Sequence, residues 1–359
     1  MTNQENLNTM KKLALVLAIT AAPFAAPMAQ AADDDAIKIY GRVNVALDAV
    51  DDGKDYSELN LSSRSSRLGF KAESKQDGYT AFVQIEQEIN FASGADGQKS
   101  LSSRDTFVGL KGDRWGTVKI GQFDTPFKAA RGSANLFGDQ VGDMRALTRV
   151  GRFDERAPNT LQYSTPSFNG LQVNLAYALH EGDKNAADAI DPSKSKKDAG
   201  TSISATYKVG ALDAALAYET WEEDHSRGER NGIRLAAAYK IGVAKVVGLY
   251  QTTRHETDKK AEADVYGLGG EYALTAATAL RAMYMARSAD ATDTDSNMLA
   301  IGVEHKLDSK LRVYMSYAML DNDKNTNYAP WNESRNTAIA NGVPDETASA
   351  LSVGLRYDF

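Results

Sequence analysis

Period-two alternation of apolar and polar side chains is the feature that most constrains the fold of this chain. In the first clear segment Ile39, Val43 and Leu47 share one parity, and Arg42 and Asn44 share the other. Successive side chains of a β-strand point to opposite faces, so the segment predicts a strand with one apolar and one wet face. Sixteen such segments occur. They span residues 37–49, 59–73, 79–91, 103–112, 115–123, 159–167, 170–180, 200–208, 211–221, 230–240, 243–253, 263–273, 278–288, 296–306, 311–320 and 349–359.

Three of these segments alternate least regularly, at 103–112, 243–253 and 278–288. The last of them overlaps the alanine-rich stretch 272–286, which also suits a helix because alanine favours helices. Leu280 and Tyr284 nevertheless fall on the parity opposite to Arg281, which favours a strand.

The connections between segments alternate between two lengths. Even-numbered connections are short turns, such as Phe168-Asn169 and Val209-Gly210, whereas odd-numbered ones are long and polar. The long ones span 50–58, 92–102, 124–158, 181–199, 222–229, 254–262, 289–295 and 321–348. Short turns at one rim and long loops at the other are typical of an outer-membrane β-barrel. Strands of about ten residues also suit a tilted bilayer crossing.

The lipid around the strands requires the sheet to close into a barrel. A strand in lipid cannot leave its edge N–H and C=O groups unpaired, so the sheet must close on itself. An even strand number brings both termini to the same rim. Sixteen strands enclose a lumen too wide for side chains to fill. The fold prediction is therefore all-β: a 16-stranded antiparallel transmembrane barrel with the polar parity facing water and the apolar parity facing lipid.

The first thirty-one residues predict a cleaved signal peptide. Lys11 and Lys12 precede an apolar stretch of about ten residues, and Ala29-Gln30-Ala31 supplies a small-x-small cleavage site. Met10 stands directly before the lysines and is a second candidate for the true start. Residues 1–31 are thus expected to be the signal peptide and 32–359 the barrel domain of an exported protein.

Composition excludes several other classes. The chain has no cysteine, so it carries no disulfide or thiolate site. No apolar run of about 18 residues follows the N-terminal segment, which excludes a helical membrane protein. A net charge of -7 argues against a nucleic-acid partner, because phosphate binding needs clustered cations.

Several stretches, in this order and spacing, resemble the general porins of Gram-negative bacteria across essentially the whole mature chain. They are Ile39-Tyr40-Gly41-Arg42, Ser66-Arg67-Leu68-Gly69-Phe70-Lys71-Ala72-Glu73, Arg104 with Phe107-Val108-Gly109-Leu110-Lys111, Trp115-Gly116-Thr117-Val118-Lys119-Ile120-Gly121-Gln122, Ala157-Pro158-Asn159-Thr160-Leu161-Gln162-Tyr163 and the terminal Arg356-Tyr357-Asp358-Phe359. The resemblance implies a homotrimer of barrels in the outer membrane, each a passive channel for small hydrophilic solutes. It implies lipid and lipopolysaccharide around the barrel, and Phe359 as a signal to the barrel-assembly machinery.

The same resemblance implies a constriction. The third long loop, 124–157, would fold into the barrel and set acidic residues opposite a basic wall. The wall positions that match are Arg42, Arg67, Arg104 and Arg156, of which Arg104 has an ambiguous parity. Phe137-Gly138-Asp139 resembles the loop tip. Asp139 and Asp143 are therefore the first acidic candidates, followed by Asp124, Asp154 and Glu155.

The sequence predicts a channel more firmly than it predicts which ions the channel prefers. The 124–157 loop holds five acids and six bases, so its net charge is +1, which favours anions slightly. Glu86 and Glu88 are expected to face the lumen and would act in the opposite direction.

Other functions find little support in the sequence. The four histidines lie far apart, and Asp290, Asp293 and Asp295 form an incomplete ligand pattern that suits a solvated loop better than a divalent cation. We therefore expect no catalytic residue, no metal site and no cofactor. A substrate-selective channel of the same architecture is the main alternative, and aromatic residues lining the path would support it. An outer-membrane enzyme or adhesion barrel is a distant third.

Overall fold

The computed structural model describes residues 37–92, 101–179, 199–222, 228–331 and 341–359. The expected signal peptide, His180 and His225 lie outside these ranges. No helix among the described residues has the length and apolar character needed to cross a membrane.

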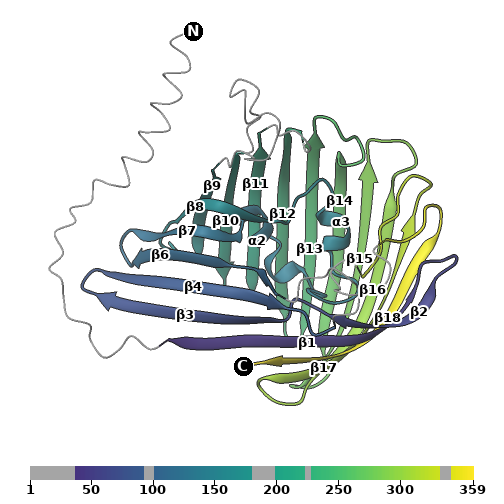
Figure 1. Cartoon of the computed structure of the whole chain (residues 1–359), viewed down its shortest axis with the longest axis horizontal. Helices are drawn as coiled ribbons and strands as arrows, with labels where there is room; N and C mark the ends of the chain where they lie inside the picture. The colour runs from purple at the N-terminus through teal and green to yellow at the C-terminus, as the bar shows by residue number, and fades with distance from the viewer. Residues whose placement is uncertain (1–36, 93–100, 180–198, 223–227, 332–340) are drawn as a thin grey trace, which may run out of the picture. The chain divides into compact units, whose positions relative to one another are not determined.

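Eighteen strand segments form one sheet in which every neighbouring pair is antiparallel, and β1 closes the sheet by pairing with β18 (Figure 1). At this seam Gly41 and Phe359 exchange backbone hydrogen bonds of 2.9 and 3.1 Å. The strands are β1 (Lys38–Asp51), β2 (Ser57–Ser63), β3 (Arg67–Gln76), β4 (Tyr79–Ile89), β5 (Leu101–Ser103), β6 (Thr106–Gly112), β7 (Gly116–Asp124), β8 (Arg156–Ser164), β9 (Leu171–Ala178), β10 (Gly200–Val209), β11 (Leu212–Trp221), β12 (Arg230–Ile241), β13 (Ala244–His255), β14 (Ala263–Ala273), β15 (Thr278–Ala289), β16 (Ser296–Lys306), β17 (Leu311–Asn322) and β18 (Thr347–Asp358).

These eighteen segments occupy sixteen strand positions. β2 and β3 both pair with β1, and β5 and β6 both pair with β4, so each of these two pairs is one interrupted strand. The first interruption contains Ser65 in the left-handed region (φ 52°), which breaks the extended backbone. The predicted 16-stranded barrel is confirmed. The prediction of unbroken strands at 59–73 and 103–112 is wrong, and the helical alternative for 272–286 is excluded by β14 and β15.

The two faces of the sheet follow the predicted alternation. On β12 the side chains of Leu235 and Tyr239 are 50% and 51% exposed on the outer face. Arg234, which has the opposite parity, is fully buried on the inner face. An outward apolar band of this kind suits lipid, and an inward polar row suits an aqueous lumen.

The inner face is not polar all round, which differs from the prediction. From β12 to β18 it carries buried apolar side chains such as Val247, Met283 and Leu320. Leu136 and Phe137 of the segment between β7 and β8 pack against them. This part of the inner wall therefore faces a folded loop rather than water, and burying its apolar surface stabilises the loop there.

The segment that covers this wall contains three short helical elements. They are α2 (Pro126–Ala129), η1 (Gly132–Ala134) and α3 (Arg145–Thr148), and Figure 1 shows α2 and α3 against the curved sheet. Thr125 starts α2, because its side chain accepts a hydrogen bond from the backbone N–H of Lys128 and Pro126 occupies the first turn. Only 125–155 lies between β7 and β8, so Asp124 and Arg156 belong to the flanking strands.

We predict that Gly41→Ala destabilises the closing seam. An added Cβ would lie 2.8 Å from the backbone oxygen of Arg67 and closer still to the Phe359 ring. Overpacking of this kind costs about 1–3 kcal/mol. The temperature at which the folded barrel converts to the slower-migrating unfolded form on a gel should fall. Gly248→Ala is the control, since its added Cβ would lie 3.9 Å from the backbone oxygen of Gly267. An equal fall in both variants would contradict the prediction.

Candidate functional site

A polar cavity of about 420 Å³ lies inside the barrel between the inner wall and the 125–155 segment. Seven cationic side chains and five carboxylates line it. The cations are Arg67, Arg104, Lys128, Arg131, Arg145, Arg149 and Arg156, and the carboxylates are Glu88, Asp124, Asp139, Asp154 and Glu155. The structure thus brings together most of the residues that the sequence pointed to, and adds Lys128, Arg131, Arg145 and Arg149 from the loop.

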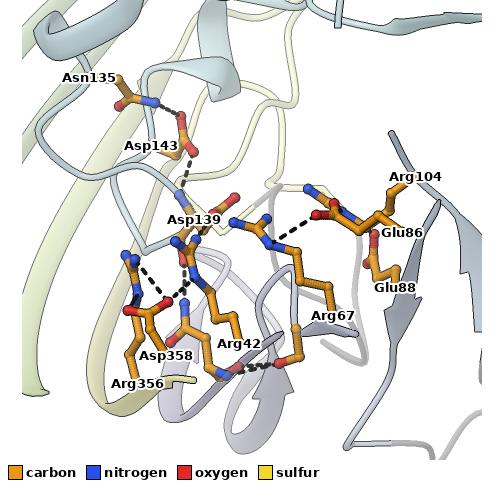
Figure 2. Close-up of polar contacts among 12 residues, drawn as sticks. Arg42, Arg67, Glu86, Glu88, Arg104, Asn135, Asp139, Asp143, Arg356 and Asp358 are labelled. Atoms are coloured by element: carbon orange, nitrogen blue, oxygen red, sulfur yellow. Dashed lines mark hydrogen bonds and ion pairs between the residues drawn. The ribbon is translucent and has the colours of Figure 1, made fainter. Parts of the chain in front are cut away.

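Arg42 lies at the edge of this cavity and joins the loop to the barrel seam. Its guanidinium contacts Asp139 at 3.1 Å and Asp358 at 2.9 Å, as Figure 2 shows. Arg356 also pairs with Asp358 at 2.9 Å. Asn44 donates a hydrogen bond to the backbone oxygen of Asp139. The loop tip is therefore held against β1 and β18 by charge and by backbone contact.

Arg67, Arg104 and two glutamates form a second group on the same wall, where Arg67 is the direct cross-strand neighbour of Arg42 (Figure 2). Arg104 contacts Glu86 at 2.7 Å and Glu88 at 3.0 Å, and Arg67 reaches Glu86 at 3.7 Å. Both glutamates lie on the inner face but are buried. Their charges are therefore balanced mainly by Arg104. Arg104 sits in the gap between β5 and β6, which explains why the parity of its side chain could not be read from the sequence.

Asp139 and Asp143, the first acidic candidates, have different surroundings. Burial alone would raise the pKa of Asp139, but Arg42 and Arg67 outweigh it and lower that pKa, so the residue stays ionised. Asp143 is buried and accepts hydrogen bonds from Asn135 at 2.8 Å and from the backbone N–H of Asp139 at 2.8 Å. Asp143 shapes the loop tip, whereas Asp139 lines the cavity.

Asp154 anchors the other end of the loop. It lies 2.5 Å from Arg234 of β12, both side chains are fully buried, and Thr148 donates to it at 2.6 Å. Arg234 also donates to the backbone oxygen of Phe127, and its guanidinium lies 4.2 Å from the centre of that ring. Burial opposes ionisation of Asp154, but Arg234 outweighs it and lowers the pKa. Arg234 was not a predicted site residue, because only the fold brings a residue 80 positions away to this loop.

Further hydrogen bonds attach the loop to the wall along its length. Gln251 donates to the backbone oxygen of Thr148 at 2.9 Å, and Arg281 donates to that of Leu136 at 3.2 Å. Each contact satisfies a buried carbonyl that water cannot reach. These anchors, also missed by sequence reasoning, hold the cavity at one width.

Arg156 and Lys128 share the carboxylate of Asp124. Arg156 Nε lies 3.2 Å and Lys128 Nζ 2.9 Å from Asp124 Oδ1, and Arg156 also pairs closely with Asp105. Burial lowers the pKa of Lys128 to about 8, only partly offset by Asp124. Glu155 pairs with Arg152 at 3.0 Å on the more exposed side of the loop.

The remaining candidates take local roles. His255 accepts hydrogen bonds from the backbone N–H groups of Thr257 and Asp258, and His305 bonds the hydroxyl of Thr278 at 2.8 Å. Within the described ranges, no group of three or more acidic or histidine side chains is placed to hold a metal ion.

Comparison with known proteins decides the family. The sequence profile of a family described as Gram-negative porin matches residues 15–325. The chain belongs to this porin family. The outer membrane porin protein 32 of Delftia acidovorans is 28% identical over 98% of this chain and 100% of its own length. A porin of Bordetella pertussis is 26% identical over 85% of each chain.

Solved porin structures share the fold. The anion-selective porin from Comamonas acidovorans covers 90% of this chain and 100% of its own, with a TM-score of 0.76 at 22% identity. An OmpF of Salmonella typhi gives 0.70 at 15% identity, and a trimer form of Vibrio cholerae OmpT gives 0.65 at 18%. The predicted porin family, outer-membrane location and channel function are confirmed by this membership and by the homologues.

We predict that Arg234→Met releases the 125–155 segment from the inner wall of this porin. Removing one partner of a buried pair costs about 3–5 kcal/mol. Asp154 would keep only its longer contact of 3.7 Å with Arg131, which belongs to the 125–155 segment itself and does not attach it to the wall. The loop should leave the wall, so the single-channel conductance should rise and become noisier. Arg254→Met is the control, because Arg254 is exposed on the neighbouring strand β13. Unchanged conductance in a folded Arg234→Met barrel would contradict the anchoring role.

We predict that the permeability of the channel to anions relative to cations falls as pH rises through about 8, because Lys128 loses its proton there. The lining of the cavity then carries one positive charge fewer. The reversal potential in a salt gradient should shift toward cations between pH 7 and pH 9 by an amount absent from Lys128→Gln. An equal shift of the reversal potential in Lys128→Gln would show that a group other than Lys128 titrates in this range.

Proposed function

We propose that this porin conducts small hydrophilic solutes by passive diffusion and that its constriction favours anions. The observation that carries the proposal is the excess of cationic over anionic side chains lining the 420 Å³ cavity. Six of the seven cations are arginines, which stay charged at every physiological pH. Low-dielectric walls concentrate the resulting field in the water-filled path.

Ion pairing inside the protein strengthens this bias. Asp154 is paired with Arg234, which lies behind the cavity and is not one of its lining residues. Glu88 is held by Arg104. The carboxylates are thus mostly matched, whereas the excess guanidiniums attract anions. A fold relative described as anion-selective supports the same direction.

We further propose that Arg42, Arg67, Arg104 and Arg156 form the basic wall and that Asp139 is the acidic loop residue facing them. Asp124 and Glu155 line the same cavity, whereas Asp143 and Asp154 serve chiefly to hold the loop. Glu86 positions Arg67 and Arg104 from behind the cavity lining, whereas Glu88 belongs to the lining and is paired with Arg104.

A homotrimer is the assembly we propose, supported by a fold relative whose structure is a trimer form. Contacts with lipopolysaccharide, and recognition of Phe359 by the assembly machinery, stay predictions. Porin membership favours a channel over the enzyme or adhesion alternatives.

The test is single-channel current of the purified protein in a planar bilayer under a salt gradient. A current that falls to zero in three equal steps supports a trimeric channel. The sign of the reversal potential reports the ion preference. No conductance from folded protein would overturn the porin function, and a cation-selective wild type would overturn the anion preference.

We predict that Arg67→Gln reduces the anion-to-cation permeability ratio about fivefold. One charge close to a permeating ion is worth about 1 kcal/mol in water, and 1.4 kcal/mol is tenfold. Arg114→Gln is the matched control, since Arg114 is exposed in the turn between β6 and β7. An equal change in both variants would show that net charge, not position, sets selectivity.

A further inference from the structure

The inner wall carries aromatic rings and lysines on the turn side of the constriction. We call this group the aromatic–lysine strip: Phe82, Phe107 and Phe123 with Lys71, Lys111 and Lys119. Val83 and Val108 are exposed on the outer face, so their neighbours Phe82 and Phe107 point inward. The Phe82 and Phe107 side chains are half-buried there. Large aromatic surface facing an aqueous lumen is not needed for simple diffusion.

The rings are held in fixed positions. Phe82 and Phe107 meet edge to face at 6.0 Å and 80°, and Phe107 meets Phe123 at 5.8 Å and 89°. The Phe82 ring lies across Gly109 of the neighbouring strand, where a Cβ would come within 2.4 Å of it. Rings packed in this way offer a rigid surface. Because they are already ordered in the folded protein, a solute that binds against them causes little further loss of side-chain entropy.

Two of the three lysines, Lys119 and Lys71, rest on aromatic rings rather than in ion pairs. Lys119 Nζ lies 3.8 Å from the centre of the Phe123 ring and 5.0 Å from that of Phe107. Lys71 lies 4.5 Å from the ring of Tyr40. Neither lysine forms an ion pair with any residue in the described ranges. A ring face holds an ammonium by its quadrupole without cancelling its charge.

One counter-charge is present. Lys111 pairs with Glu73 at 3.0 Å, on exposed side chains, and lies 6.0 Å from the centre of the Phe82 ring. The strip therefore keeps an excess of positive charge beside its apolar rings. A cavity of about 250 Å³ opens on it, lined by Phe82, Phe107, Lys71 and Lys111 among others.

We propose that the aromatic–lysine strip is a weak binding site for carboxylates that bear a single aromatic ring. This inference rests on the proposed channel function and names a solute class for it. An aliphatic carboxylate uses only the ammoniums, and a neutral arene uses only the rings. An aromatic carboxylate satisfies both, because its ring packs against Phe82 and Phe107 while its carboxylate meets Lys71, which lines the same cavity.

The position of the strip suits passage rather than storage. Lys71 lies on β3 four residues beyond Arg67 and on the same inner face. An anion that leaves the constriction on the turn side therefore meets the strip next. Conduction needs a site that attracts solute and releases it again. The small cavity and solvated lysines favour such weak, millimolar binding.

The experiment measures block of the potassium chloride current through the full-length channel in a planar bilayer. Benzoate is added on the turn side, and cyclohexanecarboxylate, acetate and benzyl alcohol are the comparison solutes. We expect saturable block by benzoate, with half-blocking concentrations for the other three at least about fivefold higher. Equal block by benzoate and cyclohexanecarboxylate would overturn the aromatic specificity, and no saturable block by benzoate would overturn the site.

Two variants locate the site. Phe82→Leu keeps an apolar side chain without the ring, and Lys71→Gln removes an ammonium that lines the cavity. Each should raise the half-blocking concentration of benzoate about fivefold. Lys208→Gln is the matched control, because Lys208 lies on β10 and pairs with Asp213 at 3.2 Å, and it should stay within about twofold.

The two proposals fail in different ways. Loss of all conductance in the wild-type protein would overturn the channel function and the site with it. Normal conductance, with benzoate block unchanged in both Phe82→Leu and Lys71→Gln, would overturn the site alone. Conductance of each variant in potassium chloride shows that it has folded and closed.

Discussion

The unbroken circuit of backbone hydrogen bonds is the constraint on which the rest of the structure depends. Lipid offers no partner to a free N–H or C=O group, so every strand must have two neighbours. The exchange between Gly41 and Phe359 completes the circuit between β1 and β18. Once the ring is closed, the inside is defined, and each inward side chain must either meet water, pair with another charge or be covered.

The 125–155 segment divides that interior into two halves with different chemistry. Toward β12–β18 it packs apolar side chains such as Phe137 against the wall. Toward β1, β3 and β8 it presents charged groups to water. The asymmetry lets one loop serve as both core and channel lining. The path for solute is therefore set by where the loop finds apolar partners, as much as by its own charges.

The sequence predicted the fold well because alternation is a local signal repeated in every strand. The same signal placed Arg42, Arg67 and Arg156 on the inner face. It could not predict that Asp143 bonds the backbone of Asp139, or that Asp154 meets Arg234, because those contacts join positions that only the folded loop brings together. Arg104 was ambiguous for a different reason, since it lies in a gap where alternation stops.

The buried pair of Asp154 and Arg234 has a mechanical consequence. The two charges are opposite, adjacent and shielded from water, so together they form a short dipole with no net charge. A uniform electric field exerts no net force on such a pair, only a torque that the packed surroundings resist. Changes in the potential across the outer membrane should therefore leave this end of the loop in place, and any voltage response must begin at charged groups that are not paired in this way.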